Sequence, residues 1–153
     1  MRYAATAARR WPALLVATTG MSVSGLALSG MAMAGGPQED YILYCMGCHG
    51  PAGRGVPGKV PPLADSLVLF MRSAEGREYL LRVPGAANSP VSDAQLADVL
   101  NWAARRFGDA HADPFTATEV SAHRHRPMAD VKARRRAVIE ALRATGPAPP
   151  DEY

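Results

Sequence analysis

Two thiols and one imidazole lie close together in this 153-residue chain, in the order Cys45-Met46-Gly47-Cys48-His49. A C-x-x-C-H run is the attachment signature of a c-type haem. Each thiol adds across a haem vinyl group to form a thioether, and the imidazole of the adjacent histidine binds the iron. The sequence therefore predicts one covalent haem c, anchored by Cys45 and Cys48, with His49 as an iron ligand.

Two other kinds of site use the same residue types. A structural zinc site needs four ligands. Because the chain has no second cysteine pair, completing one would require a distant histidine such as His111, His123 or His125. A thioredoxin-like redox pair is expected in a βαβ setting with β-branched strands, which this sequence does not offer. The haem interpretation is therefore favoured over a zinc or thiol module.

The N-terminal segment has the pattern of an export signal. Three arginines precede an uncharged, largely apolar run over residues 11–34. The run ends in Ala-Met-Ala, the small residues that a signal peptidase reads. We expect a signal peptide over residues 1–34, cleaved near Ala34, and a periplasmic protein, since haem is attached on the outer side of the bacterial inner membrane. The alternative is an uncleaved segment that anchors the protein to that membrane.

The net charge of the chain depends on this segment. The full sequence has 17 Lys and Arg against 14 Asp and Glu. Removal of residues 1–34 takes away three arginines and no acid, which leaves 14 of each sign. The predicted mature protein is formally neutral, so its charge gives no support for nucleic-acid binding.

The predicted haem domain covers residues 38–107 and contains helices and loops. A short helix leads into the haem motif, and the region over residues 50–62, with four glycines and four prolines, must be a loop. Short helical segments are expected over residues 63–71 and 75–83. The strongest helix begins at Ser92 and carries an apolar stripe to Phe107. Since no segment alternates apolar and polar residues, we expect essentially no sheet.

The order of these elements resembles a small class I cytochrome c, the mitochondrial and bacterial type with one haem. A helix ending in the haem motif is followed by a glycine-rich loop, by Pro61-Pro62-Leu63, by the short helix and by the helix containing residues 96–102. The resemblance implies an all-α fold whose first and last helices cross near one haem edge. It also implies that a proline carbonyl orients the proximal imidazole, a role assigned to Pro61, with Pro62 as the alternative.

The resemblance implies a methionine sulfur as sixth ligand, from the loop before the last helix, but residues 84–91 contain no methionine. The candidates in its place are Met71, just before the short helix, and Asn88, whose amide is the only reasonable donor for iron in that loop. Two further alternatives are a histidine of the C-terminal region and an empty or water-filled site; the histidines are His111, His123 and His125.

Residues 108–145 are predicted to form a helical extension, and residues 146–153 a disordered tail. Thr116 and Glu119 have the spacing of a capping box, which predicts a short helix to about His123. A second helix is expected to start at Pro127. Basic residues outnumber acids over residues 123–136. They form either a docking surface for an acidic redox partner or anionic lipid, or an ordinary solvated helix face.

Together these features predict an electron carrier rather than an enzyme. The leading interpretation is a periplasmic cytochrome that relays single electrons between a dehydrogenase and a downstream acceptor. Its partners would be redox proteins, with no nucleic acid and no membrane contact expected beyond the signal segment. The alternative follows from the missing methionine: an open or weakly ligated distal site predicts a haem protein that binds oxygen, nitric oxide or peroxide.

Overall fold

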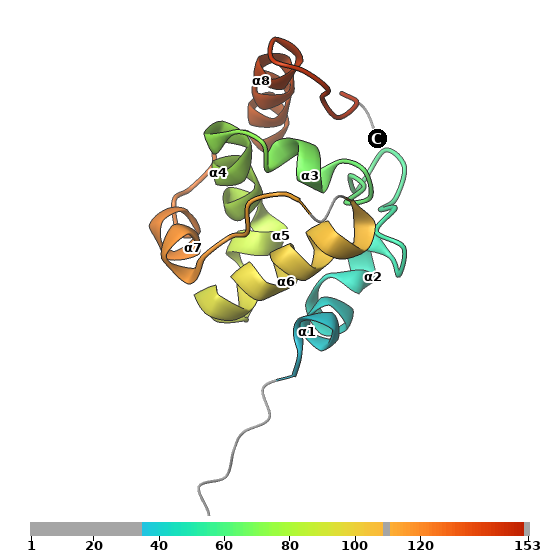
Figure 1. The fold of residues 1–153 in the computed structure, drawn as a ribbon, viewed down its shortest axis with the longest axis vertical. Coiled ribbons are helices and arrows are strands. Elements are labelled where there is room, and N and C mark those ends of the chain that lie inside the picture. The colour runs from blue at the N-terminus through green and yellow to red at the C-terminus, as the bar shows by residue number, and fades with distance from the viewer. Residues whose placement is uncertain (1–34, 109–110, 152–153) are drawn as a thin grey trace, which may run out of the picture. The chain divides into compact units, whose positions relative to one another are not determined.

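The computed structural model describes residues 35–108 and 111–151, which belong to the compact unit spanning Met33–Tyr153. The predicted signal peptide over residues 1–34 lies outside this described part. Within it the chain forms helices and no strand, apart from one isolated bridge between Val56 and Val60 (Figure 1). The prediction of an all-α fold is therefore confirmed. None of the helices described is long and apolar enough to cross a membrane.

The helices follow one another along the chain as labelled in Figure 1. They are α1 (Pro37–Tyr44), α2 (Met46–His49), α3 (Leu67–Phe70), α4 (Ala74–Arg82), α5 (Pro84–Ala87), α6 (Asp93–Phe107), α7 (Ala117–His123) and α8 (Val131–Arg143).

Helices α1 and α6 pack together through three aromatic rings. The ring of Tyr41 in α1 lies 5.1 Å from that of Trp102 and 5.3 Å from that of Phe107, both in α6. Trp102 and Phe107 also contact each other edge to face, with 5.6 Å between ring centroids. Tilted and edge-to-face pairs at these separations are favourable beyond the apolar area that they bury. This contact brings the helix before the haem motif against the C-terminal half of α6.

The N-terminus of α6 is fixed by a capping box that also links it to α1. The Ser92 hydroxyl accepts from the Gln95 amide nitrogen, and the Gln95 side-chain oxygen accepts from the Ser92 amide. These bonds satisfy donors that a helix start leaves unpaired. Gln95 Nε2 also donates to Asp40 of α1 at 3.3 Å. One side chain therefore sets both the start of α6 and its distance from α1.

The segment predicted as helical over residues 63–71 is mostly irregular, and α3 is limited to Leu67–Phe70. Asp65 interrupts it with a φ of 59°, a left-handed conformation that a helix cannot include. The chain then turns at Ser73, whose hydroxyl accepts from the Gly76 amide at the start of α4. Helix α4 crosses α3 so closely that a Cβ on Gly76 would lie 2.0 Å from the Phe70 carbonyl oxygen.

The extension forms two helices, each capped by a polar side chain. Thr116 caps α7 as the spacing predicts, by accepting from the Glu119 amide. Helix α8 begins at Val131 rather than at Pro127, because the Asp130 carboxylate accepts from the Ala133 amide at 2.8 Å. Aspartate is among the strongest N-caps. The start of the helix therefore follows the cap and not the proline.

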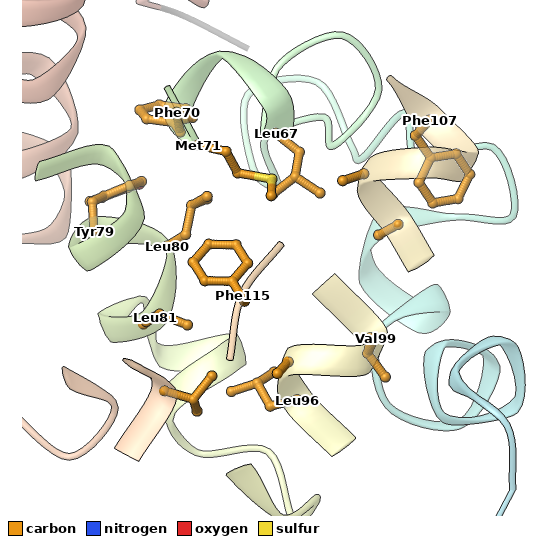
Figure 2. Packing of buried hydrophobic residues seen from close by; sticks show 14 of the residues in the cluster. Leu67, Phe70, Met71, Tyr79, Leu80, Leu81, Leu96, Val99, Phe107 and Phe115 are labelled. Atoms are coloured by element: carbon orange, nitrogen blue, oxygen red, sulfur yellow. The ribbon is translucent and has the colours of Figure 1, made fainter. Parts of the chain in front are cut away.

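The extension packs into the same core as the haem-motif helices. Figure 2 shows the ring of Phe115, from the segment before α7, among the buried side chains of α4 and α6. Asn101 of α6 holds that segment by donating to the Phe115 carbonyl at 2.9 Å and accepting from its amide at 2.7 Å. The sequence predicts a disordered tail over residues 146–153. In the structure the Pro149 side chain, within this stretch, is fully buried.

Candidate haem site

The five residues of the C-x-x-C-H run form a tight helical turn of their own. Helix α1 ends at Tyr44, and Cys45, with φ −122° and ψ −37°, separates it from α2. Gly50, with a φ of 72°, ends α2 directly after His49. The Tyr41 hydroxyl donates to the Gly50 carbonyl at 2.7 Å. This bond fixes the end of the motif against the buried face of α1.

His49 has one ring nitrogen committed and the other available. Its Nδ1 lies 3.1 Å from the carbonyl oxygen of Pro61, and since a carbonyl only accepts, Nδ1 carries the proton. The proton-free Nε2 is then the nitrogen that can bind a metal. Burial lowers the pKa of His49, and the bond to Pro61 opposes this to a lesser extent. The net lowering of the pKa favours a neutral imidazole whose Nε2 lone pair is free.

The motif lines a cavity of about 400 Å³, a size typical of small-molecule and cofactor sites. Cys45, Cys48, His49 and Pro61 all belong to its wall. The rest of the wall is largely apolar and comes from α1, the loop after α2, and α3 to α6. It includes Tyr41, Leu63, Leu67, Phe70, Tyr79, Leu80, Val83, Ala86, Val91, Leu96, Val99, Leu100 and Ala103.

The two cysteines are free thiols with different surroundings. Cys45 is half-buried and Cys48 is exposed. Burial raises the pKa of the Cys45 thiol, and the charges of Asp40 and Cys48 add to this effect. Asp40 itself is 6% exposed and lines the cavity. A carboxylate in this wall was not anticipated from the sequence, where it reads as an ordinary acid in a first helical turn.

None of the predicted sixth ligands lies in the cavity wall. Met71 is 4% exposed and packs in the core beside Phe70 (Figure 2), and Asn88 ends α5 without reaching the wall. The extension histidines His111, His123 and His125 also lie elsewhere. Among the described residues, His49 is the only histidine that lines the cavity, and no methionine does. The structure therefore places Cys45, Cys48 and His49 along one cavity, and it places the predicted sixth ligands outside the wall of that cavity.

The extension also contributes to the cavity wall. Val131 and Arg135 of α8 line it. Arg135 is 4% exposed, lies 5.0 Å from the centre of the Phe70 ring and donates to the Pro150 carbonyl at 3.2 Å. Arg135 could not be singled out from the sequence, because it belongs to a run of arginines that looks uniform. A buried arginine in that run places a positive charge at the cavity.

The zinc and thioredoxin-like alternatives find no support in the described residues. Within residues 35–108 and 111–151, no group of three or more His, Cys, Asp or Glu side chains is placed to hold a metal ion. The same residues contain no strand, whereas a thioredoxin-like pair needs a βαβ unit. The donor set of the cavity is two thiols and one oriented imidazole, which fits covalent haem.

Comparison with known proteins gives the family. No family model matches the chain. Over 98 residues it is 36% identical to a cytochrome c-552 from Thermus thermophilus, a match that covers half of this chain and 75% of that protein. A second cytochrome c-552 from the same organism shows the same identity and is covered over 66% of its length. The chain belongs to the class I monohaem cytochrome c family, whose cofactor is covalent haem c and whose members carry electrons.

Proposed function

We propose that this chain is an exported monohaem carrier that relays single electrons between a dehydrogenase and a downstream acceptor. The observation that carries the proposal is the placement of Cys45, Cys48 and His49 along one apolar cavity, with His49 Nδ1 bonded to Pro61. Export rests on the signal pattern over residues 1–34. A haem bound here supplies one-electron chemistry at its iron.

The protein residues of this site would hold and tune that group rather than react. Cys45 and Cys48 are the attachment thiols, and His49 offers Nε2 in an orientation set by the Pro61 carbonyl. Hydrogen bonding of the other ring nitrogen raises the basicity of a metal-binding histidine. The apolar residues that α3, α4 and α6 contribute to the wall would shield a bound haem from water. A rigid, dry site of this kind suits electron transfer, because little has to rearrange when the charge changes.

The cavity wall supports a second candidate function. Since no described methionine lines the cavity, and no histidine other than His49, a haem held here would receive no strong second ligand from the described cavity wall. An open or water-filled position there would admit oxygen, nitric oxide or peroxide. We propose this as the alternative to simple electron transfer. Both candidates share the same covalent attachment and the same proximal histidine.

Absorption spectra of the protein, matured in a host that attaches haem, separate the two. A carrier gives a reduced low-spin spectrum with a sharp α band that carbon monoxide does not change. A ligand-binding protein gives a high-spin reduced form that takes up carbon monoxide. Met71→Ala and Asn88→Ala variants then locate any protein ligand. A low-spin spectrum that survives both substitutions would exclude both residues.

A further inference from the structure

A single buried arginine connects the extension to the loop before α6. Arg124 caps the C-terminus of α7 and is 5% exposed. Its guanidinium donates to the carbonyls of Ala87 at 3.2 Å and Val91 at 2.7 Å, and also to the Ser89 carbonyl. It donates further to the Ser89 hydroxyl at 3.1 Å and forms an ion pair with Asp93 at 3.0 Å. One side chain thus contacts four residues of a seven-residue stretch, 87–93.

The segment that Arg124 holds is part of the haem cavity. Pro84, Gly85, Ala86, Ser89 and Val91 all line it. Helices α2 and α5 both border the cavity but do not pack closely against each other, so His49 and this segment form separate parts of its wall. Residues 84–91 contain neither a methionine nor a histidine, so what the segment contributes at the cavity is its backbone and small side chains.

Backbone bonds hold the start of the segment, where the Asn88 and Ser89 amides donate to the Pro84 and Ala86 carbonyls. The next free carbonyls depend on Arg124. Helix α5 is four residues long, and the last carbonyls of a helix have no partner within it. Arg124 supplies donors to three carbonyls after or near the end of α5. Bonds from a charged donor contribute more than neutral ones. A planar guanidinium with five donors suits such a set, whereas a lysine does not.

We propose that Arg124 is a positioning residue of the haem site: it clamps segment 84–91 in the part of the cavity wall that is separate from His49, and so controls the access of small ligands to the haem through that part. The proposal rests on the proposed function in that haem fills the cavity, and on its second candidate in that small ligands reach the iron. It assigns to the extension a role at the haem, in addition to its part in the hydrophobic core.

The structure provides a matched control for a purely stabilising role. Arg77 of α4 pins the same extension, through an ion pair with Glu119 at 2.6 Å and a bond to the Asp113 carbonyl at 2.8 Å. Its guanidinium also lies 4.2 Å from the Phe115 ring centre. Arg77 makes none of its hydrogen bonds to segment 84–91. An Arg77→Gln variant therefore weakens the attachment of the extension without releasing the clamp.

The test compares Arg124→Gln, Arg124→Lys and Arg77→Gln in the full, haem-loaded protein. The first measurement is the rate at which carbon monoxide binds the reduced protein. Loss of several charged hydrogen bonds raises the open population of the segment, so Arg124→Gln should bind carbon monoxide at least about tenfold faster than the parent. The binding rate of Arg124→Lys should fall between those of the parent and Arg124→Gln. Arg77→Gln should stay within about twofold of the parent.

Hydrogen exchange of backbone amides gives a second, haem-independent measurement. Arg124→Gln should accelerate exchange in segment 84–91, and Arg77→Gln should do so in residues 113–119 instead. Equal carbon monoxide rates in the parent and Arg124→Gln, or no uptake by either, would overturn the proposal. The proposal would also be overturned if Arg77→Gln accelerated carbon monoxide binding as much as Arg124→Gln does. If Arg124→Gln does not accumulate, Arg124→Lys decides by the same criteria. Absence of covalent haem in the parent would instead refute the proposed function, and the proposal with it.

Discussion

At the scale of single residues, the site depends on side chains that the haem motif itself does not include. Pro61 orients His49, Tyr41 fixes the end of the motif through Gly50, and Asp40 places a carboxylate in the cavity wall. The motif alone predicts the covalent anchors and the iron ligand. Asp40 could not be predicted, because its burial depends on α6 crossing α1.

The buried carboxylate of Asp40 should lower the reduction potential of the haem. Among the described residues its hydrogen-bond partner is Gln95, a neutral side chain. A negative charge in a low-dielectric wall stabilises the oxidised iron relative to the reduced iron. Asp40→Asn is therefore expected to raise the potential by on the order of tens of millivolts. Voltammetry of both proteins measures the shift.

Glu39 is the matched control for this prediction. It precedes Asp40 in α1 but is exposed and lies outside the cavity wall. Solvent and salt screen its charge, so Glu39→Gln should leave the potential nearly unchanged. Equal shifts in the two variants would refute a specific effect of Asp40.

Tyr41 should make the stability of the fold depend on alkaline pH. Burial raises the pKa of Tyr41 from 10.0 to about 12, and where Cys45 is a free thiol its charge contributes to a smaller extent. A group whose folded pKa is raised contributes stability that is full below its unfolded pKa and is lost as the pH rises through the folded one. The free energy of unfolding, from urea titrations, should fall between pH 10 and about 12.

Tyr41→Phe should lack this part of the pH dependence. It should also be less stable by about 1 kcal/mol below pH 10, because the bond to the Gly50 carbonyl is gone. Parallel stability curves for the two proteins across the alkaline range would show that Tyr41 is not responsible.

At the scale of elements, caps and close contacts decide where helices begin and how they cross. The Ser92 and Thr116 caps could be predicted from sequence, and both are confirmed. The start of α8 could not, because Asp130 and Pro127 are competing signals and the cap prevailed. The shortness of α3 follows from the backbone of Asp65, a conformation that its residue type alone does not reveal.

The crossing of α3 and α4 depends on Gly76. Since a Cβ there would lie 2.0 Å from the Phe70 carbonyl oxygen, Gly76→Ala must push the two helices apart. We expect a loss of about 3 kcal/mol or more in the free energy of unfolding. Gly47 in α2 is exposed with open space around it, so Gly47→Ala should stay within about 1 kcal/mol of the parent. A neutral Gly76→Ala would contradict the observed crossing.

At the scale of the whole molecule, the C-terminal extension is part of the core and of the cavity wall. Phe115, Val120, Val138, Ile139 and Leu142 are all buried. The basic run is also not a uniform surface, because Arg124 and Arg135 within it are 5% and 4% exposed. The sequence predicted both helices of the extension but not their inward-facing arginines, since charge patterns do not distinguish a buried arginine from a solvated one.

Removal of the extension should therefore destabilise the whole fold. A chain ending at Gly108 loses five large buried side chains, each worth about 1.5–3 kcal/mol. Its free energy of unfolding should fall by more than about 5 kcal/mol, the scale of the total stability of a small domain. A chain ending at Thr145 loses only the tail around Pro149, and should lose about 1–3 kcal/mol. If the chain ending at Gly108 had the same free energy of unfolding as the parent, the extension would be dispensable.

The central claim, that this chain carries one haem bound through Cys45 and Cys48, is tested most directly by the mass of the denatured protein. Protein matured in a haem-attaching host should keep the added mass of one haem under denaturing conditions, with the matching absorption band. The Cys45→Ala/Cys48→Ala double variant should lose both. A parent protein that releases its haem on denaturation, or a double variant that retains it, would contradict the account.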